Sequence, residues 1–149
     1  MKTQKLNTLT KNFLLVILIT GLTFFVTSCA SKVSFLNSSV VPAAKGTVKI
    51  KKGNNQNFNI QVEIEDLAEV ERLQLSKEIY LVWMETEKGI FENLGQLSNK
   101  TGFMSKQHTV SFETSSPFKP VRIFISAENE SNVRYPGSAD ILTTDKFYK

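Results

Sequence analysis

Cys29 has the most distinctive chemistry in this sequence, because it is the only cysteine in 149 residues and cannot form a disulfide within the chain. It directly follows the small and β-branched residues Val26-Thr27-Ser28, which end the apolar segment Phe13–Val26. The start of the chain is basic and holds no acid, with lysines at Lys2, Lys5 and Lys11. A basic start, a short apolar segment and small residues form the order of a secretion signal. The sequence therefore predicts export, with cleavage close to Cys29.

The motif Val26-Thr27-Ser28-Cys29 resembles the lipobox of bacterial lipoproteins. In that family the cysteine thiol carries a diacylglyceryl group, the chain is cut just before it, and the new amino group is usually acylated. The resemblance implies a signal peptide at 1–28 and a membrane anchor on Cys29. We expect the Ser-, Ala- and Pro-containing segment 29–44 to be a tether and 45–149 to be the folded domain. The alternative, an uncleaved membrane helix, needs about 20 apolar residues, whereas Phe13–Val26 has 14.

The sequence offers no evident catalytic constellation. The only histidine, His108, shares a face of an expected strand with Val110 and Phe112, and no nucleophile-elbow motif accompanies it. We therefore expect a protein that is not an enzyme and needs no cofactor. A hydrolase and a metal carrier are the less favoured alternatives.

Two sets of residues have side chains that bind metals in other proteins. His108, Met104 and Met84 offer the soft ligands that copper prefers, but methionine is also an ordinary core residue. Five carboxylates lie close together in the sequence, although the glycine-turned loop of a calcium site is missing: Glu63, Glu65, Asp66, Glu69 and Glu71. The sequence favours core packing for the first set and a solvated strand face with a helix cap for the second, so we expect no metal site.

The formal charge of +4 overstates how basic the mature protein would be. Removing residues 1–28 takes away three lysines and no acid, which leaves 15 basic and 14 acidic residues. This balance argues against nucleic acid as a partner. The segment 29–62 nevertheless holds only basic charges, at Lys32, Lys45, Lys49, Lys51 and Lys52. Lysines are attracted to an anionic leaflet, but they also protect edge strands from mispairing, and the sequence favours the second role.

From Gly46 onward, apolar and polar residues alternate with the period of two that indicates half-buried strands. A Gly-Asn turn at 53–55 predicts a hairpin, and 66–75 has the spacing of a single helical turn or compact loop. Strands are expected at 46–51, 58–65, 79–84, 90–97, 108–113, 121–128 and 141–142. About seven short strands predict an all-β, antiparallel, immunoglobulin-like β-sandwich with Trp83 in its core, and a small β-barrel is the alternative.

Residues 62–144 resemble the extracytoplasmic C-terminal domain of anti-sigma-K factors. The matching motifs are Leu73 and Leu75, Tyr80-Leu81-Val82-Trp83, Asn93-Leu94-Gly95, Val110-Ser111-Phe112, the strand 121–127 with Glu128, Pro136-Gly137 and Ile141-Leu142. The resemblance implies a shared fold, with a structural core signature at Tyr80, Trp83, Gly95, Glu128, Pro136 and Gly137. Members of that family carry a cytoplasmic sigma-binding domain, which this chain does not match, so the resemblance implies no anti-sigma activity.

These observations predict an envelope lipoprotein that binds or senses a protein or glycan partner. Because binding residues concentrate in loops on rigid scaffolds, we expect the binding surface at Asp66–Ser76, Gly95–Lys106 and Asn129–Gly137. The alternative is a structural subunit that adds a strand to a partner sheet. In a cell with two membranes, the residues after Cys29 favour the outer membrane facing the periplasm, because 30–33 contain no aspartate.

Aromatic residues near turns could also contribute to binding by stacking on sugar or peptide, although packing at the core and sheet edges is the favoured interpretation. They are Phe91, Phe103, Phe118, Phe147 and Tyr148.

Overall fold

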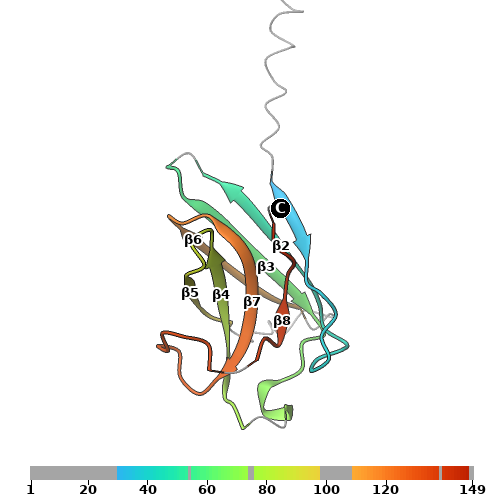
Figure 1. Ribbon diagram of the computed structural model, residues 1–149. Helices are drawn as coiled ribbons and strands as arrows, with labels where there is room; N and C mark the ends of the chain where they lie inside the picture. The colour runs from blue at the N-terminus through green and yellow to red at the C-terminus, as the bar shows by residue number, and fades with distance from the viewer. Residues whose placement is uncertain (1–29, 54, 74–75, 98–108, 138, 148–149) are drawn as a thin grey trace, which may run out of the picture.

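The computed structural model describes residues 30–53, 55–73, 76–97, 109–137 and 139–147, and these fold into two four-stranded antiparallel sheets. Sheet 1 has the order β1-β2-β3-β6, formed by Ser31–Ser34, Lys45–Lys52, Phe58–Glu65 and Thr109–Ser116. Sheet 2 has the order β5-β4-β7-β8, formed by Phe91–Gln96, Ile79–Thr86, Pro120–Glu128 and Leu142–Thr143. The prediction of an all-β sandwich is confirmed, and the barrel alternative is wrong (Figure 1).

The main core lies between the sheets, where the apolar face of each alternating strand is buried. In β3, Ile60, Val62 and Ile64 point inward. From sheet 2, Val82 of β4 and Ile125 of β7 belong to the same core. The period-two pattern in the sequence thus reflects half-burial, as predicted: one face of each such strand contacts the opposite sheet and the other faces water.

Trp83 does not belong to this main core, which corrects the prediction made for it. It is fully buried with Leu81 and Phe124 in a second cluster, on the face of sheet 2 that points away from sheet 1. Ile79 and Val133 pack against that cluster. Both faces of β4 are apolar for this reason, since one face meets sheet 1 and the other packs against β7 and the loop after it.

The segment expected to be a tether is largely part of the folded domain. β1 pairs with β2, with Ser31 opposite Ile50. Beyond β1, Phe35 forms a bridge with Thr144, and Val41 is buried in the main core. The physical reason is that β2 offers β1 a row of hydrogen-bonding groups, while Val41 gains from leaving water. The folded domain therefore begins at about residue 31 rather than 45.

The strand registers define two ends of the sandwich. The proximal end carries Ala30, where the chain leads into β1, together with residues 53 and 55–57, the turns 87–90 and 117–119 and the segment 145–147. The distal end carries 66–73, 76–78 and 129–137, including η1, a 3-10 turn at Val70–Arg72. Figure 1 shows the start of β1 and the segment that follows β8 together at the proximal end. Among the described residues, no helix is long and apolar enough to cross a membrane.

Candidate functional site

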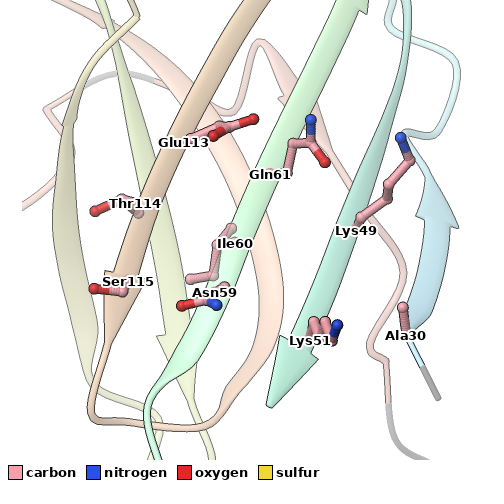
Figure 2. A pocket seen from close by; sticks show the side chains of 9 residues that line it. All are labelled: Ala30, Lys49, Lys51, Asn59, Ile60, Gln61, Glu113, Thr114 and Ser115. Carbon is pink, nitrogen blue, oxygen red and sulfur yellow. The ribbon is translucent and has the colours of Figure 1, made fainter. Parts of the chain in front are cut away.

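The outer face of sheet 1 carries polar side chains in ordered rows across three strands. Antiparallel pairing sets Lys49 of β2 opposite Gln61 of β3, and Gln61 opposite Glu113 of β6. The next row toward the proximal end consists of Lys51, Asn59 and Ser115. Because the alternate positions of these strands are the more buried ones, alternation places all six side chains on the solvent side. Figure 2 shows the rows running from β2 across β3 to β6.

These rows line a shallow hollow of about 540 Å³, the sheet-1 groove. Its lining residues are Ala30, Lys49, Lys51, Asn59, Ile60, Gln61, Glu113, Thr114 and Ser115 (Figure 2). A second hollow of about 380 Å³ lies beside β1, β2 and β3, and Lys32, Lys45 and Glu65 contribute to it. Sheet 1 therefore presents hydrogen-bonding groups over much of its outer face.

Glu63 orients two side chains near the groove. Its Oε1 lies 3.4 Å from Lys49 Nζ and accepts a hydrogen bond of 3.3 Å from Gln61 Nε2. The Lys49 and Glu63 side chains are each 40% exposed, and such exposed ion pairs add little stability. A ligand could therefore replace this ion pair with contacts to its own polar groups at a small cost in free energy. The groove offers ammonium and amide donors beside amide, hydroxyl and carboxylate acceptors, and its lining contains no aromatic ring.

The distal end contains a buried network built on Glu128, which is 2% exposed. Its Oε1 accepts hydrogen bonds from Ser126 Oγ at 2.7 Å and from the backbone N–H of Gly137 at 2.9 Å. Trp83 Nε1 donates to Ser126 Oγ at 2.9 Å, and Lys77 Nζ lies 3.9 Å from Glu128 Oε2. Three members of the predicted core signature, Trp83, Glu128 and Gly137, are thus brought together to hold the loop 129–137 on sheet 2.

The two signature glycines occupy positions that favour glycine for different reasons. A Cβ at Gly137 would lie 3.1 Å from Glu128 Oε2, so a larger residue would disturb the buried carboxylate. Gly95 has a φ of +134°, a conformation that favours glycine, at the irregularity between β4 and β5. The half-buried Pro136 precedes Gly137 in the same loop.

Asn93 fastens the loop 129–137 from β5. Its Nδ2 donates to the backbone oxygens of Ser131 at 2.9 Å and Val133 at 3.1 Å, while its Oδ1 accepts from Gly95 N–H at 3.0 Å. The sequence motif Asn93-Leu94-Gly95 marked this position without revealing its role. Only the folded chain shows why an amide, which can donate and accept at once, suits it.

Tyr80, the remaining signature residue, holds the distal segment that contains η1. Its hydroxyl donates to the backbone oxygen of Ala68 at 3.0 Å. Burial, together with the charge of Glu71, raises the pKa of Tyr80 to about 12, so the phenol stays protonated over the physiological range. A small hollow of about 190 Å³ lies beside it, lined in part by Glu71, Glu78 and Gln96. The described parts of the loop surface expected from the sequence therefore lie at one end, and residues of two of its three segments, 66–76 and 95–106, line this hollow.

The candidate metal residues do not form a site in the part of the chain that the structure describes, where no three His, Cys, Asp or Glu side chains are grouped to hold an ion. Met84 is fully buried in the main core. His108, Met104 and Cys29 lie outside the described residues, as do Phe103 and Tyr148. Among the other aromatic candidates, Phe147 packs against the main core, whereas Phe91 and Phe118 are exposed.

Comparisons with protein-family models, with curated proteins and with solved structures found no match for this sequence. The resemblance to the anti-sigma-K domain and the lipoprotein motif therefore stay predictions from the residues themselves.

Proposed function

We propose that this protein is a lipid-anchored protein of the bacterial cell envelope that binds a polar protein segment along the sheet-1 groove. The anchor is supported by Cys29, whose place after a basic start and a short apolar segment matches that of an acylated cysteine. The binding role rests on one observation, the aligned rows of Lys49, Gln61 and Glu113 and of Lys51, Asn59 and Ser115 on three hydrogen-bonded strands. We assign no catalytic role to either surface.

Several properties of the groove favour a protein over a glycan. Sugar rings gain much of their binding from aromatic faces, and the groove lining contains none. Its lysines lie on β2 and its carboxylate on β6, so the two sides of the groove differ in charge. A polypeptide can supply both signs of charge and its own backbone groups. Paired strands also fix the backbone positions of these residues before binding, so no backbone entropy of the groove is lost on association.

Addition of a partner strand is the second candidate, favoured by the position of β6 at the edge of sheet 1. β6 is eight residues long, and Glu113 is its only charged residue. Edge strands with few charges are suited to pairing with an added strand. A partner bound in this way would lie directly beside the groove.

The anchor is tested by growing cells that express the full chain with an alkyne-tagged fatty acid. We expect label on the wild-type protein and a mature mass that begins at Cys29 and includes acyl chains. The Cys29→Ala variant should carry no label and keep the mass of the precursor. An unmodified thiol in the wild-type protein would overturn the anchor.

The groove is tested by placing a photo-crosslinking amino acid at Ser115, or at Glu71 as the matched position at the distal end, in the full-length protein in intact cells. We expect a discrete protein adduct from position 115. When Glu113→Ala is combined with the crosslinker at position 115, the affinity for the partner protein should fall roughly tenfold or more, because a hydrogen bond to a charged group is lost. Adducts only from position 71 would assign binding to the distal loops, and a broad ladder of masses would indicate a glycan.

A further inference from the structure

The domain begins so soon after Cys29 that one end of the sandwich must lie close to whatever holds that residue. Ala30 alone separates Cys29 from β1, whose first residue is Ser31. Two residues of extended chain span roughly 7 Å at most. If Cys29 is acylated, as the proposed function has it, the proximal end is therefore held against the lipid surface.

That same end exposes large apolar side chains from two separate turns. Ile90, in the β4–β5 turn, is 54% exposed, and Phe118, in the β6–β7 turn, is 50% exposed. Both line one hollow of about 160 Å³, together with Thr86, Glu87, Lys88, Glu92 and Lys119. Neighbouring exposed apolar groups from different turns indicate an interaction surface more strongly than a single exposed residue does.

The two turns hold these side chains in fixed positions. Thr86 N–H donates to the backbone oxygen of Ile90 at 2.9 Å, and Ile90 N–H donates to Thr86 Oγ1 at 3.2 Å. On the other turn, Phe118 N–H donates to Ser116 Oγ at 3.1 Å. An ion pair between Lys119 and Glu87 joins the turns. The apolar pair is thus presented by a rigid frame.

Charge distinguishes this end from the distal end. The turns and the terminal segment at the proximal end hold three lysines and two acids, Lys88, Lys119, Lys146, Glu87 and Asp145, and β2 ends there with Lys51 and Lys52. The described distal segments hold five acids and three basic residues: Asp66, Glu69, Glu71, Glu78, Glu130, Arg72, Lys77 and Arg134. An anionic membrane surface attracts the first arrangement and not the second.

We propose that the proximal end docks on an anionic lipid surface, with Ile90 and Phe118 inserted at the headgroup level and Lys52 and Lys88 facing lipid phosphates. The anchor holds the β1 side of this end, whereas the two apolar turns contact lipid from the side of β4–β7. With contact at both places, the strands run away from the membrane plane instead of lying along it. The distal loops then face away from it, and the sheet-1 groove opens along its length beside the surface.

The test uses the mature, acylated protein in vesicles of phosphatidylethanolamine and phosphatidylglycerol, with brominated phosphatidylcholine as a quencher of tryptophan emission. Phe118→Trp reports on the proximal end, and Tyr135→Trp is the matched control, because Tyr135 is 74% exposed at the distal end. The native Trp83 is fully buried and supplies a background that the wild-type protein measures. Residues at the headgroup boundary lie about 5–10 Å deep, within reach of bromine on the acyl chains.

We expect the emission of Phe118→Trp to shift to shorter wavelength and to fall at least about twofold with the quencher, and that of Tyr135→Trp to stay unchanged. Replacing phosphatidylglycerol by phosphatidylcholine should weaken the quenching, as should Lys52→Glu with Lys88→Glu. Equal quenching at both positions, or none at either, would overturn the proposal. The proposal would also be overturned if the emission of Phe118→Trp shifted only after envelope protein was added, because a protein would then cover the two apolar side chains.

A second pair of variants covers the case in which Phe118→Trp does not fold. With Cys29 alkylated, Ile90→Cys and Tyr135→Cys each carry a single free thiol, and only the first should become inaccessible to a charged thiol reagent in vesicles. Flotation separates this proposal from the anchor it rests on. A protein that floats with vesicles but leaves both thiols reactive lacks only the docking, whereas one that does not float lacks the anchor.

Discussion

At the scale of single residues, Glu128 is the side chain on which the loop 129–137 depends most. It lies in a buried position and accepts hydrogen bonds from Ser126 and from the backbone of Gly137. Removing one member of such a network leaves its partners without hydrogen bonds away from water, which costs more than the lost bond itself.

We predict that Glu128→Ala lowers the free energy of unfolding by about 2 kcal/mol or more, because two donors lose a charged acceptor. Glu128→Gln keeps one acceptor oxygen and should lose less. Glu130→Ala, at an exposed position in the following loop, should change stability by less than about 0.5 kcal/mol. Urea unfolding measures all three, and equal values for Glu128→Ala and Glu130→Ala would contradict the role given to Glu128.

Tyr80 gives a second prediction at this scale, on alkaline stability. Its pKa is raised from an ordinary value of 10.0 to about 12 by burial and by Glu71. A raised pKa in the folded state means that the protonated phenol stabilises the fold fully below pH 10, and that this contribution is lost as the pH rises from about 10 to about 12. Over that pH range, the free energy of unfolding should fall more steeply for the wild type than for Tyr80→Phe. Parallel curves would show that Tyr80 does not titrate in this way.

Glu85 gives the corresponding prediction for acid. Burial raises the pKa of Glu85, but hydrogen bonds from Lys146 and Arg122 and their charges outweigh it and lower the pKa below its usual range. The carboxylate therefore stabilises the fold at neutral pH, and this contribution is lost as the pH falls through the lowered pKa. With Glu85→Gln, the melting temperature should fall less steeply as the pH is lowered below neutral, measured by thermal unfolding. An unchanged slope would mean that other carboxylates account for it.

At the scale of elements, β1 decides where the domain begins. A free tether would exchange its amide hydrogens within seconds, whereas amides bonded within a sheet exchange only when the sheet opens. Phe35 N–H donates to Gly46 at 3.0 Å, and Leu36 N–H donates to Thr143 at 2.8 Å. These bonds join the segment after β1 to both sheets, since Gly46 lies in β2 and Thr143 in β8.

We predict slow hydrogen exchange at the amides of Phe35 and Leu36, with the same amides in the urea-unfolded protein as the reference. Gly46→Ala should remove much of this protection, because a Cβ there would lie 2.6 Å from the backbone oxygen of Glu63 and 3.0 Å from Phe35. Overpacking of this kind costs about 1–3 kcal/mol. Fast exchange in the wild-type protein would restore the tether expected from the sequence.

At the scale of the whole molecule, the proposed anchor and the groove are coupled through orientation. Ala30 lines the sheet-1 groove, so the groove starts at the proximal end (Figure 2). A partner bound there would lie close to the membrane surface. Membrane attachment would also confine both molecules to one plane and raise their effective concentration.

We predict that a flexible Gly-Ser linker inserted between Ala30 and Ser31 uncouples the domain from the surface. About 20 such residues span roughly 25 Å on average, several times the reach of the native connection. Quenching of Phe118→Trp by brominated lipid should then fall, while the flotation of the protein with vesicles stays unchanged. Full quenching with the long linker would show that the apolar turns hold the surface without help from the short connection.

The sequence by itself determined where most strands lie, because alternation of apolar and polar residues records burial of one face. It also predicted Cys29 as an acylation site, and it indicated turns at positions rich in Gly and Pro. It indicated that Tyr80, Trp83 and Glu128 matter, without showing how. The strand pattern also predicted the all-β class, which the structure confirms.

Only the tertiary structure decided which face of β4 meets the other sheet. Both faces are apolar, so periodicity alone could not place Trp83, and it lies outside the main core. The docking of β1 depends on backbone hydrogen bonds to a strand more than ten residues away, which side-chain patterns do not record. The rows of the groove and the pairing of Ile90 with Phe118 likewise arise from register and turn positions, since contacts between distant segments exist only once the chain has folded.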